Sequence, residues 1–259
     1  MVMSPLPDPF PDDLDVESLL GPTQPAHHPE LRAIAISTIN GSATVSGTSA
    51  AMGNPTDAAL LQRVRGWADA VLVGAQTVRS EDYGPAYLSD ELRAARLLEG
   101  LPALPRMAVI SRSLNFPPAL RALTEFDPDF PPLVLTPQRS LDAESLAERR
   151  AELTAAGVEL AGVGDGSASE MVQALHARNL FRVTCEGGPG IYAMMWEAEL
   201  IDVVHLTVEP RVAAPVEKQL FAVRPDGDGF DLPLHLEDAQ ATADGRLFLR
   251  YRPLRPDIS

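Results

Sequence analysis

Short runs of strand length recur along this chain, several of them continuously apolar, and they are separated by longer stretches in which apolar residues follow a helical period. Such runs suit central strands of a sheet that is covered on both faces. They predict strands over residues 32–38, 69–75, 106–111, 132–137, 158–163, 181–186, 203–210 and 246–253.

The stretches between these runs predict helices over residues 55–68, 140–157, 167–179 and 190–200. The first begins at Pro55 and the second ends at Gly157, which are typical start and stop residues. Alternating strands and helices indicate an α/β fold with a mostly parallel sheet and helices on both faces. Because no helix separates the last two strands, we expect an antiparallel pair at one edge.

The first 30 residues differ from the rest in being rich in proline and acidic residues. We interpret residues 1–30 as a leader with at most one short helix near residues 12–21, either packed against the body or mobile. Residues 31–259 then form one domain.

Composition narrows the classes of function. A net charge of −15 argues against binding to nucleic acid or to an acidic membrane surface. The single cysteine, Cys185, excludes an internal disulfide and fits a reducing compartment, and the five histidines show no zinc spacing. No apolar run has the length of a membrane span, and no basic-then-apolar leader is present. These features predict a cytoplasmic protein without a metal site.

Polar residues follow the ends of three predicted strands, where ligands of open α/β sheets gather. After Gly74, Thr77 lies near the start of a helix, where a hydroxyl and free N–H groups can hold an anion. The alternative is that Thr77 only caps that helix. Ser111 and Arg112 follow another strand and suit a phosphate monoester such as the 2′-phosphate of NADPH. The alternative there is an ordinary loop with a solvated arginine.

The third strand end reads "TCEGGPG", residues 184–190. Its glycines allow a phosphate to approach the backbone, and the dipole of the following helix favours negative charge. Glu186 would repel a phosphate but can accept hydrogen bonds from the N–H groups of a heterocycle. The alternatives are a tight turn, a carboxylate on the rim, and a Cys185 that serves as a small buried hydrophobe.

A long loop of small polar residues, 37–55, separates the first strand from the first helix, and loops of this length are usually functional or mobile. Arg65 on that helix is one of the few positive charges able to meet an anionic substrate.

Five segments occur in an informative order: "TING" at 38–41, "SGTS" at 46–49, "VRGWADAVLVGAQTVRSED" at 64–82, "AVISRS" at 108–113 and "CEGGPGIYAMMWEAELID" at 185–202. Together they resemble the reductase domain of the bifunctional riboflavin-biosynthesis deaminase/reductases, which has the dihydrofolate-reductase-like fold. The resemblance covers about residues 31–255. It implies a homodimeric reductase that transfers a hydride from NADPH to an imine-like carbon of a ribosylaminopyrimidine phosphate.

The resemblance also implies roles for individual residues, although it names no proton donor. Those that match substrate-contacting positions are Asn40, Ser49, Arg65 and Glu186. Those that match positions beside the cofactor are Ile36, Gly74, Thr77, Glu81, Ser111, Arg112, Gly187, Gly188, Pro189, Gly190, Ile191 and Tyr192.

The chain departs from the family pattern at several positions. Asn40 and Glu81 stand where the family has Asp, "DYGP" replaces a D-P turn, and Val203 stands where a Glu often occurs. The zinc signatures of the deaminase half are missing. The altered substrate side leaves two alternatives open, a reductase of folate-like pterins on the same fold and a nucleotide-binding protein without turnover.

Overall fold

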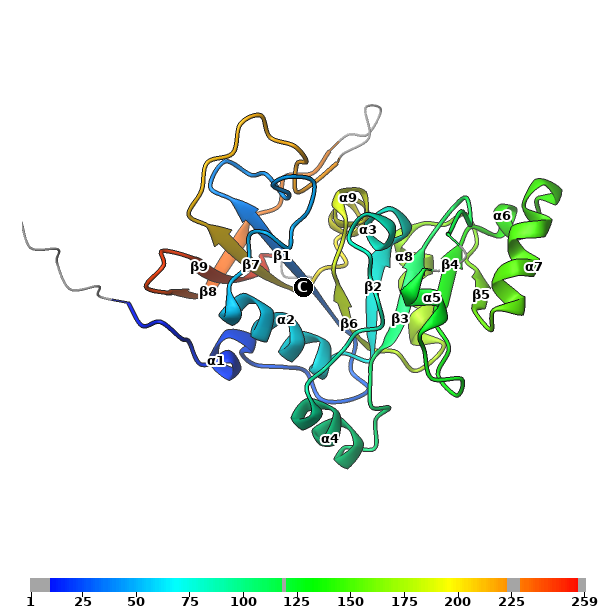
Figure 1. Ribbon diagram of the computed structural model, residues 1–259, viewed down its shortest axis with the longest axis horizontal. Helices are drawn as coiled ribbons and strands as arrows, with labels where there is room; N and C mark the ends of the chain where they lie inside the picture. Colours follow the sequence, from blue (N-terminus) through cyan, green and yellow to red (C-terminus); the bar gives the residue numbers. More distant parts are fainter. Residues whose placement is uncertain (1–9, 118–119, 223–228, 256–259) are drawn as a thin grey trace, which may run out of the picture.

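The computed structural model describes residues 10–117, 120–222 and 229–255 (Figure 1). The strands in these ranges are β1 (Glu30–Thr38), β2 (Ala70–Gly74), β3 (Arg106–Ile110), β4 (Leu133–Thr136), β5 (Glu159–Gly162), β6 (Arg182–Cys185), β7 (Val203–Glu209), β8 (Leu234–Ala241) and β9 (Leu247–Pro253). The helices are α1 (Val16–Leu20), α2 (Pro55–Trp67), α3 (Ala75–Ser80), α4 (Asp90–Leu98), α5 (Arg121–Thr124), α6 (Gln138–Asp142), α7 (Ala147–Ala155), α8 (Ala168–His176) and α9 (Pro189–Glu197), with a 3₁₀ turn at Glu144–Leu146.

The described strands form one sheet in the order β5-β4-β3-β2-β6-β1-β7-β9-β8. Neighbours from β5 to β7 run parallel, whereas β9 is antiparallel to both β7 and β8. The predicted fold class is therefore confirmed, including the antiparallel pairing of the last two predicted strands. The prediction missed β8, which lies outside β9 and forms the edge. Its sequence, "LHLEDAQA", mixes charged and apolar residues because neither of its faces is fully buried.

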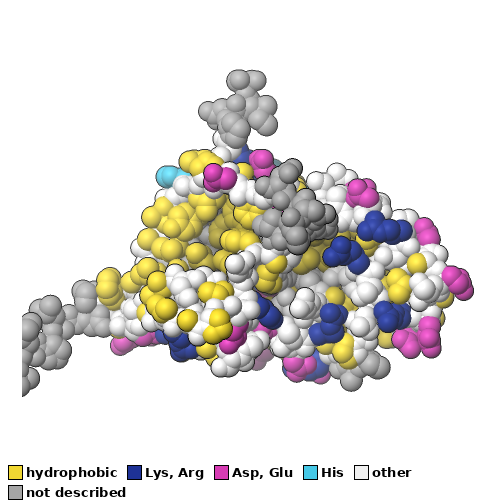
Figure 2. Space-filling view, turned by 90° about the horizontal axis from the view of Figure 1, so that it is seen from above, with side chains coloured by type: hydrophobic (Ala, Val, Ile, Leu, Met, Phe, Trp, Pro, Cys, Tyr) yellow, Lys and Arg dark blue, Asp and Glu magenta, His cyan; other side chains and the backbone are white. Residues whose placement is uncertain are grey.

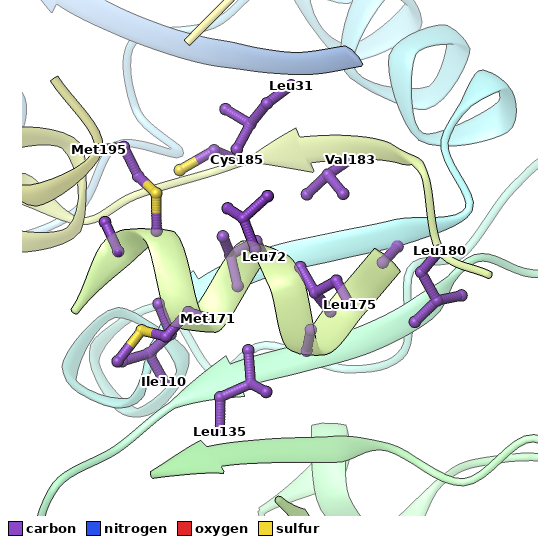
Figure 3. Packing of buried hydrophobic residues seen from close by; sticks show 14 of the residues in the cluster. Leu31, Leu72, Ile110, Leu135, Met171, Leu175, Leu180, Val183, Cys185 and Met195 are labelled. Atoms are coloured by element: carbon purple, nitrogen blue, oxygen red, sulfur yellow. The ribbon is translucent and has the colours of Figure 1, made fainter. Parts of the chain in front are cut away.

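Helices cover the sheet on two faces. On one face α8 lies across the parallel strands, and Met171 and Leu175 pack over Leu72, Ile110 and Leu135 (Figure 3). On the other face Val71, Val73 and their neighbours form a second cluster with side chains from α3, α5 and α7. The same face continues over β1 and β9 in a third cluster, in which α1 and α2 contribute Leu19, Leu20, Leu60 and Val64. The core thus extends along the whole sheet and holds α2 against β1.

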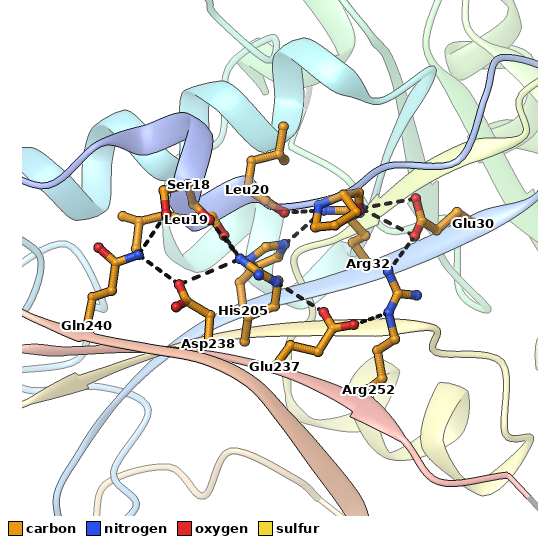
Figure 4. Close-up of polar contacts among 12 residues, drawn as sticks. Ser18, Leu19, Leu20, Glu30, Arg32, His205, Glu237, Asp238, Gln240 and Arg252 are labelled. Carbon is orange, nitrogen blue, oxygen red and sulfur yellow. Dashed lines mark hydrogen bonds and ion pairs between the residues drawn. The ribbon is translucent and has the colours of Figure 1, made fainter.

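The described part of the predicted leader is packed against the body. Its short helix, α1, is present, and Leu20 at its end is buried. Buried guanidinium groups hold the carbonyl oxygens that follow: Arg32 donates to Leu20 O at 2.6 Å, and Arg250 donates to Ser18 O at 2.8 Å (Figure 4). Because these carbonyls have no partner within the short helix, the two arginines supply their hydrogen bonds.

Two helix predictions need correction. The single helix expected over 140–157 is divided into α6, the 3₁₀ turn and α7, because the backbone is extended at Ala143 and Ser140 Oγ donates to Arg112 O at 2.9 Å. The prediction also missed α4, although Ser89 is a regular N-cap that accepts a hydrogen bond from Leu92 N. No helix in the described ranges is long and apolar enough to cross a membrane.

Candidate active site

The carboxyl ends of the parallel strands lie at one edge of the sheet, and there β1 parts from β6 (Figure 1). β6 pairs with β1 only as far as Ala33, opposite Cys185, whereas β1 stays paired with β7 up to Thr38. Ile36, predicted to lie near the nicotinamide, is in the part of β1 beyond the end of β6. A divergence of neighbouring strands at their carboxyl ends is where open α/β sheets bind ligands.

The loops after β2 and β6 are tied together at this point. Gly74 N donates to Gly187 O at 2.7 Å, and Gly188 N donates to the Thr77 hydroxyl at 2.9 Å. The proposal that Thr77 caps its helix is wrong, because α3 begins at Ala75 with Gly74 as its N-cap and without a capping side chain. Thr77 instead joins the first turn of α3 to the N-terminus of α9.

The glycines of the "EGGPG" turn serve different purposes. A Cβ at Gly187, whose φ is +77°, would lie 2.3 Å from the Tyr192 ring, and one at Gly188 would lie 2.5 Å from Thr77 Oγ1. These two glycines are therefore required by close packing within the protein. At Gly190 a Cβ would meet nothing within 4 Å, and this residue is exposed in the first turn of α9. Of the three, Gly190 is the one with open space for a ligand.

A largely buried cluster of three polar side chains lies beside this turn. Arg65 from α2 binds the Glu186 carboxylate through two parallel hydrogen bonds, Nε to Oε1 and Nη2 to Oε2, both at 2.6 Å. The Tyr83 hydroxyl donates to Glu186 Oε2 at 2.6 Å, and the Arg65 guanidinium lies 5.6 Å from the centre of the Tyr83 ring. The Glu186 side chain is only 3% exposed, so this is a desolvated, paired charge.

The protonation states of two members follow from this pairing. Burial favours a lower pKa for the Arg65 guanidinium, but the charge and hydrogen bonds of Glu186, with those of Tyr83, raise it above its usual value. Burial, and then the adjacent Glu186 charge, raise the pKa of the Tyr83 hydroxyl well above its usual range. At neutral pH Arg65 is charged and Tyr83 keeps its proton.

The long loop after β1 is anchored by two carboxylates. Glu81 accepts hydrogen bonds from Thr48 Oγ1 at 2.6 Å and from Ser49 N at 3.3 Å, and Glu217 accepts from Ser46 N and Gly47 N, both at 2.9 Å. Ser49 and Glu81, predicted to contact different ligands, are thus in contact with each other.

Asn40, at the start of the same loop, is exposed, and its amide is occupied by the protein. Asn40 Nδ2 donates to Ala213 O at 2.6 Å, and Oδ1 accepts from Ala213 N at 3.0 Å. The structure therefore gives this side chain a role in joining two loops, and its predicted contact with the substrate stays a prediction.

At the end of β3, Ser111 and Arg112 have different surroundings. Ser111 is buried, and its hydroxyl accepts a hydrogen bond from Leu114 N at 3.1 Å. Arg112 is exposed, and it is the one arginine among the described residues whose guanidinium has no hydrogen bond or ion pair with the protein. An unpaired guanidinium at a strand end is available to an anionic ligand.

The residues present fit a dinucleotide such as NADPH in three respects. The N-terminus of α9 has no capping side chain, Gly190 leaves open space beside it, and Arg112 offers an unpaired positive charge. Tyr192 is different, because it is buried and its hydroxyl donates to Ile34 O. Ile191 packs against Gly74, where a Cβ would lie 2.9 Å from Ile191 Cγ1. These two hold α9 against the sheet.

Sequence reasoning missed Tyr83 as a member of this site. The one available signal was "DYGP" in place of the family's D-P turn, which puts an aromatic residue at a position that usually carries proline. Cys185 is buried and its thiol has a pKa raised by burial to about 12, as expected of a small buried residue. Among the residues with described positions, no group of three or more His, Cys, Asp or Glu could hold a metal ion.

The family model of the RibD C-terminal domain matches residues 29–246, which is most of the chain. This chain belongs to the RibD C-terminal domain family. The family assignment confirms the resemblance drawn from the five sequence segments. A comparison with curated proteins gives no match.

Several solved structures are similar to this chain over 88–91% of its length. A pyrimidine reductase-like protein from Corynebacterium diphtheriae has 40% sequence identity and a TM-score of 0.80, covering 88% of this chain and 93% of that one. RibD from Acinetobacter baumannii has 20% identity and a TM-score of 0.68, covering 88% of this chain and 58% of its own. A riboflavin biosynthesis reductase from Saccharomyces cerevisiae has 14% identity and a TM-score of 0.62, and the match covers 91% of this chain and 94% of that one. The last two likenesses establish the fold.

Proposed function

We propose that this member of the RibD C-terminal domain family is an NADPH-dependent reductase that acts on a ribosylaminopyrimidine phosphate or a close analogue. The observation that carries the proposal is the turn at residues 186–190. One side of it offers an uncapped helix N-terminus with open space at Gly190, and the other carries the buried Glu186–Arg65 pair. A single turn can therefore hold a phosphate-bearing cofactor and, next to it, a heterocycle with N–H groups.

In this proposal each side of the turn has a distinct task. NADPH, when bound, supplies the hydride. Gly190 and the α9 N-terminus hold its pyrophosphate, Arg112 holds its 2′-phosphate, and Ile36 of β1 lies at the nicotinamide end. Glu186, oriented by Arg65, accepts a hydrogen bond from an N–H group of the substrate. The loop carrying Ser49 covers the site. The protein contributes position and a desolvated charge, which are the usual contributions to cofactor chemistry.

Steady-state oxidation of NADPH tests the proposal against its two alternatives. We expect turnover with 5-amino-6-(5-phosphoribosylamino)uracil and none with dihydrofolate. Turnover with dihydrofolate alone would favour the pterin reductase, and tight NADPH binding without turnover on either substrate would favour the nucleotide-binding protein.

Cofactor choice provides a prediction on Arg112. If its guanidinium holds the 2′-phosphate, NADPH binds about tenfold or more tightly than NADH, because a charge-assisted hydrogen bond is worth about 1.5–3 kcal/mol. Arg112→Ala should remove most of that difference and leave NADH affinity unchanged, as measured by fluorescence titration.

Arg139→Ala is the control, because Arg139 is also exposed, on helix α6 after β4, but donates to Asp165 O at 2.9 Å. It removes the same charge and should leave both affinities unchanged. Equal affinities of the wild-type protein for NADPH and NADH would contradict the assignment.

A homodimer is part of the same proposal and rests on an apolar face of the sheet. Beyond α9 this face is formed by β7, β9 and β8. On β7 it carries Val204, Leu206 and Val208, which pair with Tyr251, Leu249 and Leu247 of β9. The same three residues of β9 pair on their other side with β8. Leu236 on this face is 46% exposed. Figure 2 shows hydrophobic side chains gathered on the half of the molecule that carries these strands. An exposed apolar surface of this kind marks an interface, here with a second copy of the chain.

We expect sedimentation to give a dimer at micromolar concentration and Leu236→Glu to give a monomer, because a charge in the interface would be buried without a partner. Leu98→Glu is the control, because Leu98 on α4 is 90% exposed on another surface. A wild-type monomer would remove this part of the proposal.

The proposed function also includes a cytoplasmic location, which is consistent with the free thiol of Cys185.

A further inference from the structure

The Glu186 carboxylate has little acceptor capacity left for a substrate. A carboxylate oxygen accepts about two hydrogen bonds. Oε2 already accepts from Arg65 Nη2 and from the Tyr83 hydroxyl, whereas Oε1 accepts only from Arg65 Nε. One acceptor position, on Oε1, therefore remains open among the described contacts.

Tyr83 is held firmly in the position from which it donates. Its backbone N–H donates to Val78 O at 3.0 Å, and its carbonyl accepts from Ala122 N at 2.9 Å. Its ring packs against a buried hydrophobic cluster and beneath the Arg65 guanidinium. Because its hydroxyl also keeps its proton at neutral pH, Tyr83 is a permanent donor to Oε2.

The edges of candidate heterocycles differ in how many N–H groups they present. A pterin presents a ring N–H and an amino group side by side, and a carboxylate accepts a hydrogen bond from each of them, one on each oxygen. The imide edge of a pyrimidinedione presents one N–H between two carbonyls and needs one acceptor. With Arg65 alone, Glu186 would have one open position on each oxygen and would match the pterin edge.

We propose that Tyr83 is a specificity-determining residue: by occupying Oε2 it leaves Glu186 a single acceptor, which selects the imide edge of a pyrimidinedione over the paired donors of a pterin. This inference rests on the proposed function and names the edge that its site reads. An N–H of a bound pterin would then be buried without a partner, which costs the hydrogen bond that it made to water.

The test compares two probe ligands, 5-aminouracil and pterin, on NADPH-saturated full-length protein by ligand-observed NMR. Tyr83→Phe keeps the ring and frees the second position on Oε2. We expect this variant to shift the ratio of dissociation constants about tenfold toward pterin, since it gains one charge-assisted hydrogen bond. Tyr87→Phe is the control and should leave the ratio unchanged, because the Tyr87 hydroxyl donates to Glu125 instead.

Each outcome decides the question. A ratio in Tyr83→Phe that equals the wild-type ratio, or moves toward 5-aminouracil, overturns the role of Tyr83 while leaving the proposed function intact. Wild-type protein that binds neither probe overturns the proposed function, and this inference with it. A second comparison uses only the wild-type protein. The probe 1,3-dimethyl-5-aminouracil, which lacks ring N–H groups, should bind it at least about tenfold more weakly than 5-aminouracil. Equal binding would show that Glu186 accepts no hydrogen bond from a ring N–H and would also overturn the inference.

Discussion

Arg65→Met is expected to lower the free energy of unfolding by about 3–5 kcal/mol, because it leaves the buried Glu186 carboxylate without its charge partner. Both side chains are largely buried, with 14% of Arg65 and 3% of Glu186 exposed, so water cannot replace the lost hydrogen bonds. Urea denaturation monitored by circular dichroism measures this loss. Turnover should be lost as well, because the carboxylate that meets the substrate is no longer oriented.

Two further variants separate stability from function. Arg65→Met combined with Glu186→Gln removes both charges and keeps an acceptor for the Tyr83 hydroxyl, so most of the stability should return while turnover stays absent. Arg63→Met on the same helix should cost only about 0–1 kcal/mol, because its partner Glu17 is 64% exposed. If Arg65→Met were no less stable than Arg63→Met, the buried pair would contribute little to the fold.

Gly188→Val is expected to weaken NADPH binding at least about 100-fold, equivalent to about 2.8 kcal/mol, and to lower the melting temperature. Its Cβ would lie 2.5 Å from Thr77 Oγ1, so the hydrogen bond from Gly188 N to Thr77 must break and the N-terminus of α9 must move. Calorimetric titration with NADPH and thermal melting measure the two effects.

Gly190→Ala serves as the comparison within the same turn. A Cβ there meets nothing in the protein, so the fold should keep its melting temperature while a bound pyrophosphate would be crowded. We therefore expect weaker NADPH binding without loss of stability. Unchanged NADPH affinity in both variants would place the pyrophosphate elsewhere.

Much of the fold could be predicted because it depends on local patterns. The predicted runs became β1–β7 and β9. Among them β2, β3, β4 and β6 are buried at every position, as expected of central strands covered on both faces. The edge strand β8 escaped prediction because none of its residues is buried, so its composition is mixed. The helix expected over 140–157 failed at Ala143, where contacts with the loop after β3 outweigh local helix propensity.

For the site, the sequence by itself determined which strand ends carry polar residues and glycines, because such residues interrupt an apolar pattern and can be seen in it. Their partners were decided only by the tertiary structure. In the sequence, Arg65 and Glu186 are 121 positions apart, Tyr83 and Glu186 are 103 positions apart, and Gly188 and Thr77 are 111 positions apart. A periodic pattern records whether a side chain is buried, but the residue that it meets depends on how strands distant in sequence are ordered in the sheet. For that reason only the structure showed that close packing requires glycine at positions 187 and 188, and only the structure brought Tyr83 into the site.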